Sequence, residues 1–373
     1  MRKTICLGDM ATYINGYAFK PIDWGTKGLP IIRIQNLTDT GKEYNYYDGE
    51  VKEKYLVKKG DVLISWSASI GVFEWEKEDA WLNQHIFKVV FDKGEVDKQY
   101  FKYVTGYVLK KSLQHAHGST MKHLTRGTFD KLPIPIYDLK EQRVIAEKIG
   151  KVDEAIAECD AMLADFDLLV KSRFIEMFGD PVTNDMNWET DILKNLGELN
   201  RGVSKHRPRN APELLGGPYP LVQTGDVSNA DTYINDYSST YSEIGLKQSR
   251  MWSKGTLCIT IAANIAQTGI LTFDACFPDS VVGFISGSRT NQMYMHYWFS
   301  FFQKILEEQA PQSAQKNINL QILSNLSVMV PPLELQEKFA KFVELAYKSK
   351  LTIQKSMDNL QELRNSLLQE YFG

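Results

Sequence analysis

The chain has 373 residues, enough for two domains with sizeable cores, and it contains no apolar run near the length of a membrane span. Its four cysteines, Cys6, Cys159, Cys258 and Cys276, show no CxxC spacing, which argues against a disulfide framework or a zinc site and favours a reducing cytoplasm. The net charge of −3 does not indicate a nucleic-acid-binding protein, but local basic clusters still bind phosphate when the total charge is near zero.

Residues 1–138 are predicted to form a mixed α/β domain. Strand-like runs occur in LPIIRIQNLTD (29–39), KKGDVLISWSASIG (58–71) and AWLNQHIFKVV (80–90), and the first two run into small or polar residues. The stretch YFKYVTGYVLKKSLQ (100–114) has the pattern of a helix. A loop rich in lysine and histidine follows it, so the domain combines strands, a helix and a basic loop.

Residues 139–179 are predicted to form one long helix. Its apolar residues are spaced alternately by four and three, which is the heptad pattern of a coiled coil. We call these positions the seam; they are Ile145, Ile149, Val152, Ile156, Cys159, Leu163, Phe166 and Val170. A helix of about 38 residues is roughly 57 Å long at 1.5 Å per residue. The sequence Gly179-Asp180-Pro181 ends it.

The second half of the chain repeats the first. Within residues 180–332 the stretch SKGTLCITIAANIA (253–266) corresponds to 58–71, and the other strand-like and helical stretches recur in the same order. Residues 333–373 match the first long helix without a gap. At an offset of 194, Gln142 falls on Gln336 and Phe178 falls on Phe372.

This repeat predicts an α+β fold in which two related mixed α/β domains are separated by two long helices. Two equal helices, each following its own domain, can pair as an antiparallel coiled coil about a pseudo-twofold axis. Lys350 and Arg364 occupy seam positions of the second helix, and polar seam residues fix register at a cost in stability. The alternative is two ordinary amphipathic helices of a bundle, which leaves their matching phase, length and FG terminus unexplained.

The repeated motifs resemble those of the specificity subunit of type I restriction–modification systems. The motifs are GSTMKHLTRGTFDKLPIPIYDLKEQ, KSRFIEMFGDP, QKNINLQILSNLSVMVPPLELQ and the paired KGD and KGT strands. One departure is that IPIYDLKEQ lacks the double proline of VPPLELQ. The resemblance covers essentially the whole chain. It implies target-recognition domains at 1–138 and 180–332 and spacer helices at 139–179 and 333–373.

No catalytic or metal-binding set stands out in the sequence. There is no GxxxxGK[ST] phosphate loop, no FxGxG-like cofactor loop and no Asn-Pro-Pro-aromatic stretch. Glu50-Val51-Lys52 matches a metal-dependent nuclease only weakly, and its surroundings read as a solvated turn. His115, His117 and His123 lack nearby cysteines to complete a metal site. We therefore predict no catalytic residue, no metal and no cofactor in this chain.

Basic and hydroxyl side chains in two loops are candidates for contacts with DNA phosphates, since cations, hydroxyls and backbone amides suit phosphate oxygens. In the first half they are Lys110, Lys111, His117, Ser119, Thr120, Lys122, His123 and Arg126. In the second half they are Arg201, Lys205, Arg207, Arg209, Lys316 and Asn317. The alternative for both sets is a basic face that is merely solvated.

Amide, guanidinium and short polar side chains that follow the strand-like runs are candidates for reading base edges. In the first half they are Arg33, Gln35, Asn36, Ser65, Ser67 and Ser69. In the second half they are Gln223, Thr224, Asp226, Thr260 and Asn264. Each could instead cap a turn.

The family resemblance implies a DNA-binding subunit without chemistry of its own. It implies that each domain reads one half of an asymmetric bipartite double-stranded DNA target, with a nonspecific gap of fixed length between the halves. It also implies two modification subunits and a restriction subunit as partners, which carry S-adenosylmethionine, ATP and Mg, and no membrane association. Apolar helix positions outside the seam are the candidate docking surface, and the alternative is that they only fill the junctions between domain and helix: Leu168, Leu169, Phe174, Leu363 and Leu368.

Two other kinds of protein remain as alternatives at this stage. One is a coiled-coil scaffold that binds proteins and does not read DNA. The other is the specificity portion of a self-contained restriction enzyme.

Overall fold

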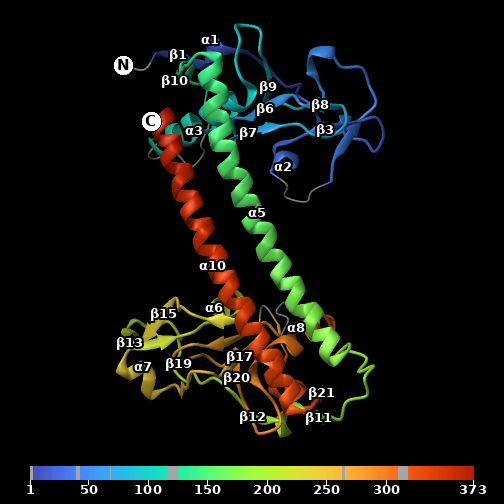
Figure 1. The fold of residues 1–373 in the computed structure, drawn as a ribbon, viewed down its shortest axis with the longest axis vertical. Coiled ribbons are helices and arrows are strands. Elements are labelled where there is room, and N and C mark those ends of the chain that lie inside the picture. The colour runs from blue at the N-terminus through green and yellow to red at the C-terminus, as the bar shows by residue number, and fades with distance from the viewer. Residues whose placement is uncertain (1–2, 39–42, 68, 116–124, 263–264, 310–317) are drawn as a thin grey trace. The chain divides into compact units, whose positions relative to one another are not determined.

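The computed structural model describes residues 3–38, 43–67, 69–115, 125–262, 265–309 and 318–373. The chain forms two compact units, one of residues 1–160 with 355–373 and the other of residues 161–354. Each unit contains one α/β domain and one part of each of two helices of 40 residues, α5 (Leu139–Phe178) and α10 (Leu333–Phe372) (Figure 1). In the described part of the chain, no helix is long and apolar enough to cross a membrane.

The first domain is built on two four-stranded sheets, with strand orders β2-β9-β6-β7 and β4-β3-β8-β5 in the described residues. The strands are β2 (Thr12–Asn15), β3 (Leu29–Ile32), β4 (Asn45–Tyr47), β5 (Leu56–Val57), β6 (Val62–Ser65), β7 (Gly71–Glu74), β8 (Ala80–Leu82) and β9 (Ile86–Val90). A separate pair joins β1 (Thr4–Cys6) to β10 (Pro133–Pro135). The helices are α1 (Leu7–Met10), α2 (Ile34–Leu37), α3 (Lys98–His115) and α4 (Arg126–Asp130), with 3₁₀ turns at Pro21–Asp23 and Glu53–Tyr55.

Alternation along β6 explains how the first domain buries both faces of one sheet. Val62 and Ile64 belong to the apolar cluster that contains Phe101 of α3. Leu63, between them, belongs to a second cluster with Leu82 of the other sheet. All of these side chains are at most 1% exposed. Because successive strand residues point to opposite faces, four consecutive buried residues serve two cores.

The second domain repeats this topology, with described strand orders β12-β20-β17-β18-β14 and β15-β13-β19-β16. The strands are β11 (Thr190–Ile192), β12 (Gly197–Arg201), β13 (Leu215–Leu221), β14 (Tyr233–Ile234), β15 (Ser239–Tyr241), β16 (Met251–Trp252), β17 (Leu257–Thr260), β18 (Thr268–Leu271), β19 (Ala275–Cys276), β20 (Val281–Ser286) and β21 (Ser327–Met329). The helices are α6 (Thr224–Ser228), α7 (Glu243–Lys247), α8 (Gln292–Gln309) and α9 (Leu320–Ser324), with 3₁₀ turns at Leu193–Asn195 and Pro212–Leu214.

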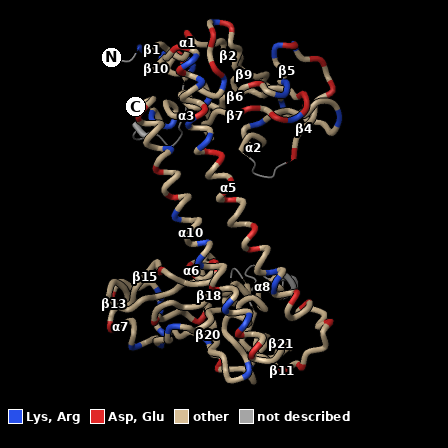
Figure 2. The backbone as a smooth tube through the Cα atoms, viewed as in Figure 1, with Lys and Arg blue, Asp and Glu red and all other residues tan. Residues whose placement is uncertain are grey.

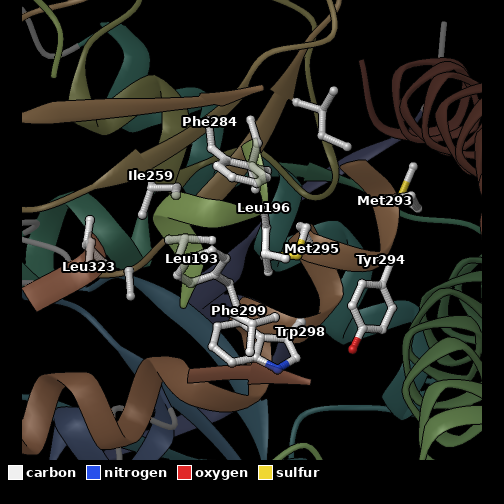
Figure 3. Close-up of a cluster of buried hydrophobic side chains, with 14 of the residues drawn as sticks. Leu193, Leu196, Ile259, Phe284, Met293, Tyr294, Met295, Trp298, Phe299 and Leu323 are labelled. Atoms are coloured by element: carbon white, nitrogen blue, oxygen red, sulfur yellow. The ribbon is translucent and has the colours of Figure 1, made fainter. Parts of the chain in front are cut away.

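The largest described apolar core of the second domain lies around α8. Figure 3 shows Trp298 and Phe299 of this helix in the buried cluster that also contains Leu193, Leu196 and Phe284. These five side chains are at most 1% exposed. Close packing of large side chains therefore fixes α8 against the sheet.

The internal repeat is confirmed at the level of single hydrogen bonds. The buried side chain of Gln142 accepts a hydrogen bond at Oε1 from the backbone N–H of Asp97, at 2.9 Å. Gln336 accepts the equivalent bond from the backbone N–H of Asn291, at 2.8 Å. Each glutamine also donates its Nε2 to the carbonyl five residues earlier in the chain. Both pairs are separated by the offset of 194 found in the sequence, so the two halves share one frame.

The C-terminal end of each long helix packs into a domain. Phe372 contacts Tyr100 of α3, with ring centroids 5.6 Å apart. Phe178 contacts Tyr294 of α8, with ring centroids 5.0 Å apart. Tyr294 lies 194 positions after Tyr100, and Phe372 lies 194 positions after Phe178, so the two contacts are equivalent under the repeat. The C-terminal end of each long helix therefore packs against the domain that precedes the other helix.

The two long helices pair as an antiparallel coiled coil, as predicted. In one unit Arg364 of α10 forms an ion pair with Asp153 of α5. In the other unit Lys350 Nζ lies 2.6 Å from Asp167 Oδ1. Residue numbers rise along α5 as they fall along α10 in these pairs, which is the antiparallel order. Figure 2 shows that basic and acidic residues both occur along the two helices.

The predicted seam of α5 faces inward. Its side chains are buried at Ile145, Ile149, Val152, Cys159 and Val170 and half-buried at Ile156, Leu163 and Phe166. The two basic seam positions of α10 are the residues that form the ion pairs with α5. A polar seam residue with a partner of opposite charge specifies which positions face each other. The contacts of Lys350 and Arg364 therefore agree with the prediction that these two residues fix the register of the helices.

Two of the five residues predicted to form the docking surface are buried. Phe174 is 0% exposed and Leu368 is 9% exposed, because both pack into domain cores at the helix ends. They are core residues, and the prediction that they form an exposed surface was wrong. Leu168, Leu169 and Leu363 are 63%, 49% and 47% exposed.

Candidate nucleic-acid interface

In the first domain, the two predicted base-reading segments lie at the same edge of the fold. Strand β3 runs parallel to β8, with Ile32 opposite Leu82, so the chain leaves both strands at one edge. Strand β6 is antiparallel to β9, with Ser65 opposite Ile86. The short connection 83–85 joins β8 to β9 and therefore lies between the segment that follows β3 and the segment that follows β6.

This connection carries polar residues that the sequence analysis did not select. His85 is exposed and has a φ of 75°, in the left-handed region that non-glycine residues rarely adopt. Its ring lies 5.1 Å from the ring of Trp66, and its carbonyl accepts a hydrogen bond from the backbone N–H of Trp66. Gln84 donates its backbone N–H to the carbonyl of Tyr17 at 2.8 Å. The polar sequence NQH between two apolar strands is the signal that could have identified these residues.

The candidates after β3 are partly engaged in local structure. Asn36 accepts the backbone N–H of Arg33 at 2.9 Å, which caps helix α2. The guanidinium of Arg33 lies 4.8 Å from the ring centroid of Trp24 and donates to Asn45 Oδ1 at 3.3 Å. Arg33, Gln35 and Asn36 are all half-buried. Asn36 therefore has the turn-capping role that was the alternative, and a contact with DNA stays a prediction.

The serines after β6 differ in exposure. Ser65 and Ser67 are 0% and 6% exposed, and Ser69 is exposed. Ser65 Oγ donates a hydrogen bond to the carbonyl of Ser69. The hydroxyl of Ser65 therefore closes this turn, and among these three serines Ser69 has the accessible side chain.

The second domain has the same edge with different side chains. Strand β13 is parallel to β19, with Leu221 opposite Cys276, and β17 is antiparallel to β20, with Thr260 opposite Val281. The connection 277–280 joins β19 to β20. Hence the segment after β13, the segment after β17 and this connection lie together, as their equivalents do in the first domain.

The predicted residues on this second edge also have local partners. Asp226 accepts the backbone N–H of Gln223 at 2.7 Å and the hydroxyl of Ser238 at 3.1 Å. Thr260 is buried, and its Oγ1 accepts the backbone N–H of Gln267 at 3.1 Å. Asp226 thus caps α6 as Asn36 caps α2. Thr224 lies in the first turn of α6, and Asn264 lies outside the described residues.

Three of the predicted basic residues of the second domain converge on Asp279, in the connection 277–280. Arg209 Nη2 lies 2.6 Å from Asp279 Oδ1, and Arg207 Nη2 lies 3.6 Å from Asp279 Oδ2. Arg201 Nε donates to the backbone carbonyl of Asp279 at 2.9 Å. Lys205 has an exposed side chain in the same loop. Asp279 was missed because a single aspartate after a strand carries no distinctive sequence signal.

The basic candidates of the first domain are only partly described. Lys110 and Lys111 are exposed near the end of α3, and Lys111 Nζ lies 5.8 Å from the ring centroid of Tyr107. Arg126 binds Asp130 at 2.8 Å and donates Nη1 to the carbonyl of Tyr13 at 2.8 Å, so it holds α4 against β2. The other candidates of the first domain lie outside the described residues: His117, Ser119, Thr120, Lys122 and His123. Lys316 and Asn317 of the second domain also lie outside them.

Titratable groups in the second domain are perturbed by burial. Burial lowers the pKa of His296 to about 4, and its Nδ1 lies 2.9 Å from Thr268 Oγ1. Burial also raises the pKa of Cys276. Among the described residues, no group of three or more His, Cys, Asp and Glu side chains is arranged to hold a metal ion. The side chains of His296 and Cys276 are both buried in the interior of the domain.

Two domains of one topology, each with a polar edge and each followed by a helix of 40 residues, define a recognition protein built on an internal repeat. The family model for the type I restriction modification DNA specificity domain matches residues 2–159 and 186–363, and the chain belongs to this family. It is therefore a specificity subunit of a type I restriction–modification system, a recognition subunit that performs no catalysis itself.

Relatives with this description span both halves of the chain. The EcoBI specificity subunit of Escherichia coli is 25% identical over 398 aligned residues, which cover 98% of this chain and 83% of the relative. The EcoKI specificity subunit of Escherichia coli is 23% identical, with 91% and 80% covered. A putative MjaX specificity subunit of Methanocaldococcus jannaschii is 20% identical, with 90% and 86% covered.

Solved structures share the fold. The S subunit of a type I restriction–modification system from M. genitalium superposes with a TM-score of 0.57 at 15% identity, covering 100% of this chain and 96% of that chain. A chain from a structural study of type I complex assembly and conformational transition gives a TM-score of 0.62 at 15% identity, covering 99% and 97%. At these identities the likeness supports the two-domain, two-helix fold.

Proposed function

We propose that this subunit reads an asymmetric, bipartite double-stranded DNA target, with one half-site read by each domain. The observation that carries the proposal is that the same polar edge occurs in both domains with different side chains. The first domain presents Arg33, Gln84 and His85 there, and the second presents Gln223 and Asp279 with its arginines. Base edges are distinguished by such amide, imidazole and guanidinium groups, so different edges imply different half-sites.

The gap between the half-sites is proposed to be fixed by α5 and α10. Both helices run for 40 residues without interruption, and their pairing is specified by ion pairs at seam positions. A continuous helix has a defined rise of about 1.5 Å per residue. Two such helices paired in one register are suited to act as a spacer of set length.

The partners are proposed to be two modification subunits and one restriction subunit. The modification subunits dock on the helices, where Leu168, Leu169 and Leu363 expose apolar side chains, and they methylate adenine with S-adenosylmethionine. The restriction subunit supplies ATP-driven, Mg-dependent cleavage. The support is the family of the chain together with exposed leucines that no core contact explains.

Exchange of one domain tests independent reading. Residues 1–138 are replaced by the corresponding domain of another specificity subunit, and the methylated adenines are mapped in a genome where this complex is the only such system. We expect one half-site to change, with the other half-site and the gap preserved. A simultaneous change of both half-sites would contradict the proposal, and a loss of all methylation with intact assembly would show that the chimaera does not bind DNA.

A further inference from the structure

The loop 202–210 of the second domain is held rigidly at the polar edge. A Cβ atom on Gly202 would lie 2.3 Å from the carbonyl oxygens of both Phe277 and Pro278, so a glycine is required for this close approach. The backbone N–H of Gly202 donates to the carbonyl of Val281 at 2.8 Å. The start of the loop is therefore fixed against the connection 277–280.

The middle of the loop is anchored by side chains from a neighbouring segment. Gln248 Oε1 accepts the backbone N–H groups of Lys205 and His206, at 2.6 and 3.0 Å. Ser249 Oγ donates to the carbonyl of Val203 at 2.7 Å. Arg207 Nη1 bonds carbonyls within the loop itself. These hydrogen bonds hold the backbone of the loop at several points along its length.

Asp279 holds the guanidinium of Arg209 at the end of this loop. The 2.6 Å contact between Arg209 Nη2 and Asp279 Oδ1 is an ion pair in which the side chains are 47% and 31% exposed. A guanidinium has five N–H donors in a planar fork, so an ion pair through one terminal nitrogen leaves donors for a second partner. The aspartate therefore orients Arg209 without consuming its hydrogen-bonding capacity.

Arg209 shares a pocket with residues that were predicted from the sequence to read bases. Gln223 and Thr224 line this pocket of about 250 Å³ together with Arg209, Asn210 and Ser280. These five residues combine a guanidinium, two amides and two hydroxyls from three separate segments. Such a set can satisfy the donors and acceptors of a base edge, whereas a phosphate needs only positive charge and N–H donors.

We propose that Arg209 is a specificity-determining residue that reads a guanine base in the second half-site, and that Asp279 is its positioning residue. Arginine binds guanine O6 and N7 through two parallel hydrogen bonds in the major groove. Pairing with Asp279 offsets the positive charge of Arg209, which lowers its attraction for a phosphate but leaves its N–H donors suited to the neutral edge of a base pair. Position 279 corresponds to Gln84 of the first domain, so this form of reading belongs to the second domain. The inference rests on the proposed function.

The test uses the assembled complex of this subunit with its modification subunits and a DNA library randomised in both half-sites. Arg209→Ala is expected to lose the preference for guanine at one position of the second half-site by about 10- to 100-fold. The first half-site, read in the same experiment, should keep its preferences. Asp279→Asn, which keeps the size but removes the charge, should weaken the preference at that same position.

Lys205→Ala is the matched control, because Lys205 lies in the same loop with an exposed side chain and is a candidate for phosphate contact. It should weaken binding to all sequences alike and reduce the salt dependence of binding, without changing preference at any base. If Arg209→Ala behaves in this way, Arg209 contacts phosphate and the inference is wrong.

Two further outcomes separate the inference from the proposed function. If the unaltered complex shows no sequence preference, the proposed function itself fails. If the unaltered complex reads two half-sites and neither Arg209→Ala nor Asp279→Asn changes a base preference, only the inference fails. Thermal unfolding of Asp279→Asn shows whether the second domain is still folded, so a loss of reading through misfolding is recognised.

Discussion

His296 couples the stability of the second domain to pH through a single buried side chain. It is 6% exposed, its Nδ1 lies 2.9 Å from Thr268 Oγ1, and burial lowers its pKa to about 4. The nearby charge of Asp231 acts in the opposite direction but is the smaller effect. The imidazole is therefore neutral in the folded protein at pH values where an exposed histidine is already protonated.

Unfolding should become easier as the pH falls through this window. Above a pH of about 6.5, His296 is neutral in both the folded and the unfolded protein. Between this pH and the folded-state pKa of about 4, only the unfolded chain binds the proton, so protonation favours unfolding. The free energy of unfolding is expected to fall by about 3 kcal/mol from this group between pH 7 and pH 4. Denaturant unfolding of the wild type and His296→Gln at both pH values measures it. An equal pH dependence of the two proteins would contradict the prediction.

At the scale of single residues, the sequence predicted which polar residues follow the strands but not the role of each side chain. Arg33, Asn36, Gln223 and Asp226 all lie where the strand pattern placed them. However, a capping aspartate or asparagine and a base-reading one have the same local sequence, and only the hydrogen bonds of the folded chain separate them. The side chain of Asp279 pairs with arginines some 70 residues earlier in the chain, so the residues next to Asp279 in the sequence could not reveal this contact.

At the scale of elements, the burial of a residue on a long helix depends on whether the other helix or a domain packs against its face. Phe174 and Leu168 both lie outside the seam of α5 near its C-terminal end, but Phe174 is 0% exposed and Leu168 is 63% exposed. Phe174 stacks on Tyr294 with ring centroids 5.5 Å apart. The heptad pattern predicts only the face between two helices. The wider buried face at the helix ends depends on the domain packed there, which the pattern does not contain.

Substitutions at Phe174 and Leu168 should therefore differ in their effect on the free energy of unfolding. Phe174→Ala is expected to lower the free energy of unfolding by about 3–5 kcal/mol, because it leaves a cavity in the core. Leu168→Ala should change it by less than about 0.5 kcal/mol, since an exposed side chain loses few contacts. Chemical denaturation of both variants provides the comparison. A stability loss of similar size for Leu168→Ala would contradict the prediction and show that the side chain of Leu168 is buried in the free protein.

The same pair of variants tests the docking proposal. Leu168→Ala should reduce association with the modification subunit, measured by co-purification of the two proteins, while the fold is retained. Lys348, exposed on α10, offers a control position where an alanine should alter neither stability nor association. Unchanged association of Leu168→Ala together with Leu169→Ala would place the docking surface elsewhere.

At the scale of the whole molecule, the internal repeat gives one chain two domains built on a common frame. The glutamines at 142 and 336 make the same bonds, and the phenylalanines at 178 and 372 contact equivalent tyrosines. The frame was predictable because its residues recur at a constant offset. The polar edges that we propose to read DNA were less predictable because their loops diverge, and two different half-sites would require such divergence.

The central claim is that paired helices hold two independent readers at a set spacing, and a matched insertion tests it most directly. One heptad is added after Asp160 in α5 and one after Gln354 in α10, at the limits of the two compact units, so contacts within each unit are preserved. Seven residues add about 10 Å of helix, equivalent to about three base pairs of DNA. Mapping of methylated adenines should then show both half-sites unchanged and a gap longer by about that amount. Methylation of the original target with its original gap would contradict the account.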